Sequence, residues 1–70
     1  MYNNDMFAAA LRMHRAKLNI TQAELASKVG IDPTAISQYE QGSRIPGADK
    51  LFALAEVLEC SPCDLLGWKA

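Results

Sequence analysis

Uncharged polar side chains recur at helical spacing in one short stretch of this sequence. Thr34, Ser37, Gln38 and Gln41 stand at positions i, i+3, i+4 and i+7 of the segment PTAISQYEQG. Residues with this spacing share one face of a helix. Outward faces of helices normally carry Lys, Glu or Arg, so an uncharged stripe indicates a face that makes directed hydrogen bonds.

Hydrogen bonding to DNA bases is the chemistry that such a face could perform. The major groove admits one helix and presents donors, acceptors and the thymine methyl group. Gln can bond adenine twice, Ser can bond several bases, and Thr can contact the methyl group. Pro33 and Thr34 would lie in the first turn, which reaches base edges in a recognition helix. We therefore expect Pro33, Thr34, Ser37 and Gln38 to read bases.

Contacts to phosphates should flank this face. Thr21 and Gln22 stand at the start of the preceding helix, where free N–H groups and the helix dipole favour a phosphate. Gln41 lies further along the base-reading helix, nearer the backbone of the groove. Ser43 and Arg44 follow that helix and could hold the other side of the groove. We expect these residues to contact phosphates.

Two charges stand where apolar residues are expected. Arg15 lies four residues after Leu11 and three before Leu18, on the buried stripe of its helix. Glu40 lies four residues after Ile36, also on a buried stripe. A lone buried charge costs several kcal/mol, roughly, whereas an opposite pair can satisfy each other. We predict an Arg15–Glu40 ion pair; the alternative is that both side chains reach out to solvent.

Five helical segments would position these residues. The capping box of Thr21 and Glu24 indicates the start of one helix, and Asp32 before a proline indicates the start of the next. Gly30 and Gly42 indicate where these two helices end. The tight turn between two capped helices predicts a helix-turn-helix over about residues 21–41. The expected segments are about 5–18, 21–29, 33–41, 48–58 and 62–66.

The later segments contribute the rest of the predicted core. Leu51, Phe52, Leu54 and Leu58 are helically spaced, so we expect them to face inward. Ile45 is expected to anchor the preceding loop in the core. A second start signal, Ser-x-x-Asp, opens the short last helix.

Composition limits the class of protein. The 70 residues allow one domain, 1–70, and the abundance of Ala and Leu favours an all-α fold. Net charge is −1, divided as +1 over residues 1–44 and −2 over residues 45–70, which only permits a nucleic-acid partner. The sequence shows no membrane span or signal peptide, so we expect a cytoplasmic protein with reduced cysteines.

The segment from Leu11 to Leu66 resembles the Cro/C1-type (XRE-like) helix-turn-helix family. The motifs that carry the resemblance are LNITQAELASKVGI, ISQYEQGSRIP and LAEVLECSPCDLL. The resemblance implies a compact five-helix bundle of the lambda-repressor-like type that binds operator DNA as a homodimer. It also implies that Gln22 and the exposed residues of the third helix sit at DNA, and that Arg15 and Glu40 match a structural ion pair. A regulator, in particular a repressor, acting on a pseudo-palindromic double-stranded operator is the function expected.

Other interpretations remain at this stage. Cys60 and Cys63 form a C-x-x-C pair, but two cysteines cannot complete a zinc site, so we expect structural roles, no metal and no cofactor. A cysteine-based sensor is the least favoured alternative. A protein-interaction module of the same fold, such as an antitoxin or a polymerase-contacting controller, is the main one. Trp68 would fold onto the core of a monomer or pair across a dimer axis. Nothing indicates catalysis.

Overall fold

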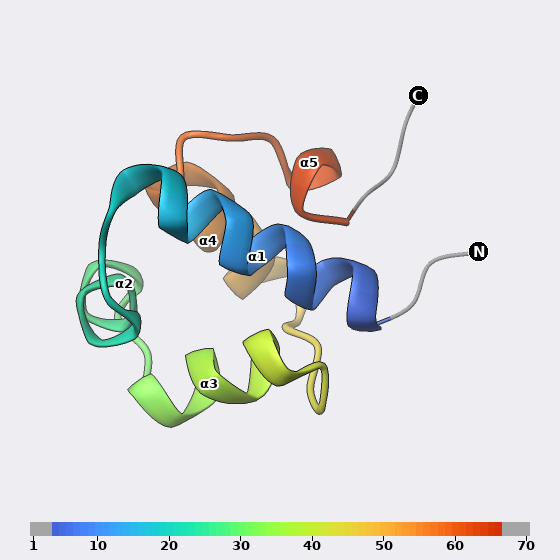
Figure 1. Ribbon diagram of the computed structural model, residues 1–70, viewed down its shortest axis with the longest axis horizontal. Helices are drawn as coiled ribbons and strands as arrows, with labels where there is room; N and C mark the ends of the chain where they lie inside the picture. Colours follow the sequence, from blue (N-terminus) through green and yellow to red (C-terminus); the bar gives the residue numbers. More distant parts are fainter. Residues whose placement is uncertain (1–3, 67–70) are drawn as a thin grey trace.

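The computed structural model describes residues 4–66, and this part of the chain is helical without strands. The helices are α1 (Asn4–Leu18), α2 (Gln22–Val29), α3 (Pro33–Gln41), α4 (Ala48–Val57) and α5 (Pro62–Leu66). In Figure 1, α1 crosses the middle of the molecule, α3 runs below it, α4 lies behind it and α5 lies above. The expected all-α bundle is confirmed.

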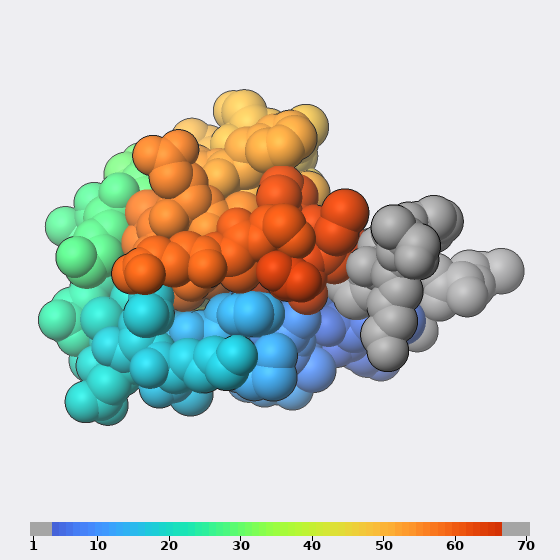
Figure 2. All heavy atoms as spheres, turned by 90° about the horizontal axis from the view of Figure 1, so that it is seen from above, coloured from blue at the N-terminus to red at the C-terminus, as the bar shows by residue number. Residues whose placement is uncertain are grey.

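One core is shared by all five helices. The ring of Phe7 meets that of Tyr39 edge to face, with 6.2 Å between centroids. Figure 2 shows the side opposite α3, where α5 lies between α1 and α4 and closes the core. The largest fully buried side chains come from every helix and are Phe7, Leu11, Leu25, Ile36, Leu54 and Leu65.

Reciprocal capping boxes start two of the helices. The Thr21 hydroxyl accepts from the Glu24 N–H at 3.0 Å, and the Glu24 carboxylate accepts from the Thr21 N–H at 2.9 Å. Ser61 and Asp64 repeat the arrangement before α5, at 3.1 and 3.0 Å. Both boxes were predicted from the Ser/Thr-x-x-Asp/Glu spacing and are confirmed.

The turn between α2 and α3 is short because each end of it is specified locally. Gly30 ends α2 with φ of 84°, a left-handed conformation that glycine adopts without steric cost. Asp32 then accepts from the Thr34 N–H at 2.7 Å, and Pro33 fills the first helical position. This turn fixes the angle at which α3 leaves α2.

Two expectations about the core are wrong. Phe52 is 62% exposed, because it lies two residues, or about 200° of helix rotation, before the fully buried Leu54. Ile45 is 40% exposed, and the neighbouring Pro46 is the buried residue of that loop. Helix α4 also ends at Val57, one residue earlier than expected.

Among the described helices, none is both long and apolar enough to span a bilayer. The expected packing of Trp68 falls outside the described residues.

Candidate nucleic-acid interface

The polar stripe of α3 lies on the side turned away from the core. Pro33, Thr34 and Gln41 are exposed, and Ser37 and Gln38 are partly exposed. In Figure 1 no other helix covers the lower side of α3. The structure therefore brings the predicted base-reading residues together on one open helix face.

Hydrogen bonds between side chains order this face. The Gln41 amide donates to the Ser37 hydroxyl at 3.2 Å, and Arg44 donates to Oε1 of Gln38 at 3.3 Å. The hydroxyl of Ser43 donates to the main-chain carbonyl of Gln38 at 3.2 Å. With Oε1 of Gln38 turned to Arg44, the amide NH₂ of Gln38 remains the donor for an outside partner.

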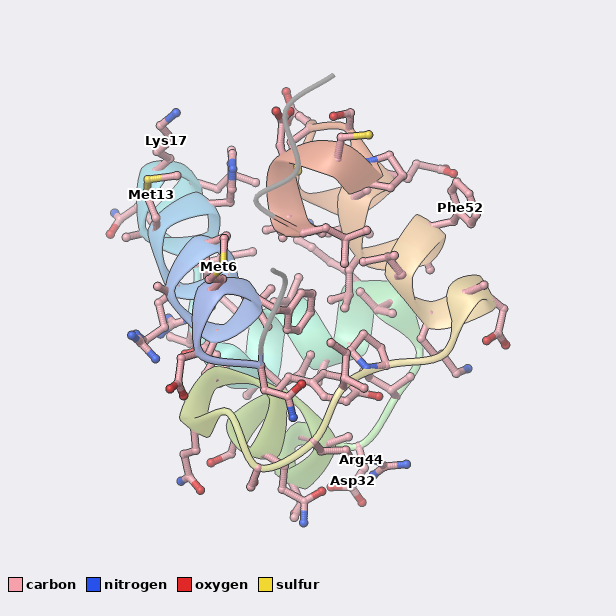
Figure 3. All side chains as sticks on the ribbon, turned by 90° about the vertical axis from the view of Figure 1, so that its right-hand side faces the viewer. Met6, Met13, Lys17, Asp32, Arg44 and Phe52 are labelled. Atoms are coloured by element: carbon pink, nitrogen blue, oxygen red, sulfur yellow. The ribbon has the colours of Figure 1, made fainter. Side chains whose placement is uncertain are left out.

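Arg44 is a cation beside the C-terminal half of this face. Its guanidinium lies 5.7 Å from the centroid of the Tyr39 ring, in addition to its bond to Gln38. Figure 3 shows Arg44 at the α3 edge of the molecule. The Tyr39 ring and the Gln38 carboxamide thus hold the exposed positive charge of Arg44 beside the uncharged face of α3. A phosphate that flanks a groove occupied by α3 would lie next to this charge.

A bidentate ion pair locks α3 to α1. Nε of Arg15 donates to Oε2 of Glu40 at 2.6 Å, and Nη2 donates to Oε1 at 3.0 Å. The remaining Nη1 donates to the carbonyl of Ile20 at 2.9 Å. Only 4% of the Glu40 side chain is exposed, against 24% for Arg15, and the hydrogen bonds that Arg15 donates to Glu40 raise the pKa of Arg15. Neither charge is left to reach into solvent alone.

The same carboxylate also holds the start of α2. Nε2 of Gln22 donates to Oε1 of Glu40 at 3.1 Å. That amide group carries a second proton, which stays available to an acceptor outside the protein. The capping box occupies the N–H groups of Thr21 and Glu24, which leaves those of Gln22 and Ala23 to solvent or to an anion. The start of α2 therefore combines the positioned side-chain amide of Gln22 with backbone N–H groups that the capping box leaves available.

Contacts from α1 to the end of α3 were not predicted. Arg12 donates through Nη1 to the main-chain carbonyl of Glu40, and Asn4 donates to the carbonyl of Gly42 at 3.3 Å. Gly42 has φ of 78°, and a Cβ there would lie 2.8 Å from Oδ1 of Asp5. These contacts involve backbone acceptors, so no spacing of side-chain types in the sequence could have revealed them.

The cysteines lie apart from this face. Cys60 is half-buried after α4, where burial raises the pKa of its thiol, and Cys63 is exposed in α5. Within residues 4–66 the structure contains no group of three or more His, Cys, Asp or Glu side chains placed to hold a metal ion.

Two capped helices at a fixed angle, with the second presenting an open polar face, define a helix-turn-helix protein. Residues 11–65 match the family model described as helix-turn-helix. The chain belongs to the Cro/C1-type helix-turn-helix family.

Known proteins of this family resemble the chain over most of its length. It is 41% identical over 64 residues to repressor protein C2 of Salmonella phage P22, covering 91% of this chain and 30% of that protein. It is 41% identical over 56 residues to the transcriptional regulator DicA of Escherichia coli K12, covering 80% of this chain and 42% of DicA. The chain thus spans less than half the length of these relatives.

A solved structure shares the fold. The crystal structure of the P22 c2 repressor protein in complex with a synthetic operator superimposes with a TM-score of 0.85 at 40% identity. The match covers 90% of this chain and 96% of that chain. The likeness is therefore to nearly all of a chain whose structure was solved in complex with a synthetic operator.

Proposed function

We propose that this chain is a single DNA-binding domain, residues 1–70, that regulates transcription by binding an operator through the major groove. The observation that carries the proposal is the open, uncharged polar face of α3, held at a fixed angle by the Arg15–Glu40 ion pair. Relatives that are repressors or regulators support a repressor role in particular. The proposal assigns the chain no catalytic role, and it places the protein in the cytoplasm with its DNA.

Base reading is assigned to the first two turns of α3. The exposed methyl and hydroxyl groups of Thr34, with Pro33 beside them, meet the groove first. Ser37 and Gln38 follow one turn later and supply hydroxyl and amide groups to base edges. An uncharged face suits this task, because a Lys or Arg would bind any phosphate regardless of sequence.

Phosphate contacts are assigned to residues on either side of α3. Gln22 offers the second proton of its amide and the N–H groups of the first turn of α2. Thr21 keeps its hydroxyl proton, since that oxygen only accepts in the capping box. On the other side, Arg44 supplies a positive charge, with Ser43 and Gln41 adding polar donors.

The dimensions of the molecule are compatible with a homodimer on a pseudo-palindromic site, which is the assembly that we propose. Two recognition helices reading successive turns of one DNA face lie about 34–36 Å apart. The molecule measures 30 × 23 × 21 Å along its principal axes, so two copies at that spacing lie side by side. Two-fold pairing is the commonest arrangement of identical subunits and would mirror the symmetry of the site.

Two variants test the division of roles. We expect Gln38→Ala to cost about 1–3 kcal/mol on the preferred site and to relax selectivity at one base position. Arg44→Ala should weaken binding to all duplexes and lower the slope of log K against log salt by about one phosphate contact. Lys28→Ala, an exposed change away from the face, serves as the control. Fluorescence anisotropy measures the affinity of each variant for the selected duplex and for a random duplex. Equal losses of affinity on both duplexes for both variants would contradict the assignment.

A further inference from the structure

The outward face of α4 presents an aromatic ring framed by negative charge. Phe52 is 62% exposed. Asp49 precedes it by three residues and Glu56 follows it by four, both at exposed positions on the same side of the helix. Glu59, just after α4, is exposed as well, and the neighbouring base Lys50 is half-buried. We name Asp49, Phe52 and Glu56 the α4 face.

The outward face of α1 presents the complementary chemistry. Met13 is 51% exposed, and small alanine side chains lie one turn to either side of it. Arg12, whose Nη1 donates to the carbonyl of Glu40, and Lys17 are exposed on its two flanks. The acid of this helix, Asp5, stands at the N-terminal end, so the second half of α1 is basic. We name Arg12, Met13 and Lys17 the α1 face.

These two faces lie on opposite sides of the molecule. Figure 3 shows Met13 and Lys17 on one side and Phe52 on the other. We propose that the α4 face of one molecule packs against the α1 face of a second copy. In this contact Phe52 covers the thioether of Met13, a favourable sulfur–aromatic pairing, and the acids of α4 meet the bases of α1.

The charges favour a head-to-tail contact over a two-fold one. Pairing two α4 faces would set Asp49 and Glu56 against acids, and pairing two α1 faces would set Arg12 and Lys17 against bases. Joining one face of each kind places opposite charges together. A head-to-tail contact leaves one face free on each end and can extend to further copies. It is therefore distinct from the two-fold pairing proposed above, and it does not depend on DNA binding.

The contact should be weak in dilute solution. A standard interface takes about 800 Å² from each partner, more than a single helix face offers. A dissociation constant of about 0.1 mM is therefore expected. Molecules held close together, as on adjacent sites of one DNA, would still make the contact because their effective concentration is high.

Sedimentation equilibrium of the chain without DNA tests the proposal. At low salt, and at concentrations up to about 1 mM, the weight-average mass should rise beyond that of a dimer and fall again when salt is added. Lys17→Glu and Glu56→Lys should each weaken the association about threefold or more. An equimolar mixture of these two variants should associate again, because the reversed faces complement each other, and so should the double variant. Lys28→Glu makes the same charge change outside both faces and should have no effect.

The following results would overturn the proposal. One is that the wild-type chain stays monomeric at about 1 mM, and another is that its weight-average mass stops rising at the mass of a dimer. They also include a Lys28→Glu variant that weakens association as much as Lys17→Glu, and a mixture that does not recover. Unchanged thermal midpoints of the single variants will show that association, and not folding, was altered.

Discussion

Among single residues, Glu40 connects the most distant parts of the candidate site. Its buried carboxylate accepts from Arg15 of α1 and from Gln22 of α2, and its own carbonyl accepts from Arg12. The residue itself reads no base. In the proposed interface its contribution is to fix where α2 and α3 stand relative to each other.

Removing the partner of this carboxylate should be costly. Arg15→Ala leaves Glu40 buried without its cation, and we expect the free energy of unfolding to fall by about 3–5 kcal/mol. Lys28→Ala, an exposed change, should alter it by less than about 0.5 kcal/mol. Urea unfolding at neutral pH measures both. A loss below about 1 kcal/mol for Arg15→Ala would mean that the pair does not hold the bundle together.

The sequence was sufficient to predict this pair but not its surroundings. Arg15 and Glu40 were conspicuous because charges rarely occupy positions that helical spacing places inside. Arg12 was not conspicuous in the sequence, because it stands at an exposed position. Its acceptor is a main-chain carbonyl that only the folded chain brings near. The contact from Gln22 to Glu40 depends on the angle between α2 and α3, which residue spacing does not encode.

At the scale of the elements, the turn that follows α4 contains a residue poorly suited to its conformation. Glu59 has φ of 59°, a left-handed value that a side chain disfavours and glycine tolerates. Glu59→Gly should therefore stabilise the fold by up to about 1 kcal/mol, because the cost of the left-handed conformation exceeds the extra entropy that glycine loses on folding. The matched change Glu56→Gly, inside the helix, should destabilise it by about 1 kcal/mol. Thermal unfolding of the two variants distinguishes them: a loss of stability in both would contradict this account.

Capping carboxylates make the helix starts sensitive to acid. Backbone N–H groups hold the pKa of Glu24, Asp32 and Asp64 below their usual ranges. The folded state therefore binds fewer protons than the unfolded chain near those pKa values. The stabilisation is present above about pH 4 and is lost as the pH falls through the lowered values.

Asp32→Asn tests this pH dependence. Asn keeps an acceptor for the Thr34 N–H but does not titrate, so stability at neutral pH should change little. The fall in thermal midpoint between about pH 5 and pH 3 should be shallower in the variant than in the wild type. Parallel pH profiles of the two proteins would show that the Asp32 cap contributes nothing to the acid sensitivity.

Helix starts were predictable because a cap is a local signal, complete within four residues. The side of α4 that is buried was harder to predict, because the apolar residues of this helix cover more than one side and either side could have faced the core. Phe52 was placed inward together with the other helically spaced apolar residues, yet Leu54, Ala55 and Leu58 define the side that the other helices cover. The prediction that Ile45 is buried was wrong for a related reason, because the conformation of a loop depends on the residues that pack around it.

For the whole molecule, the five helices form a frame that presents α3. The chain is small, with net charge −1, so the DNA binding that we propose rests on a few placed donors and not on overall charge. Total composition therefore gave little indication of a DNA partner, whereas the position of uncharged residues on one helix gave a strong one. We expect binding to weaken steeply with salt, in proportion to the number of phosphates contacted.

Selection of bound duplexes from a random DNA pool tests the central claim most directly. The account predicts enrichment of one pseudo-palindromic sequence whose half-sites lie about 10–10.5 base pairs apart, one turn of the helix. The Gln38→Ala variant, selected in the same way, should lose preference at one position of each half-site and keep the spacing. Recovery of a pool with no enriched sequence would contradict the account.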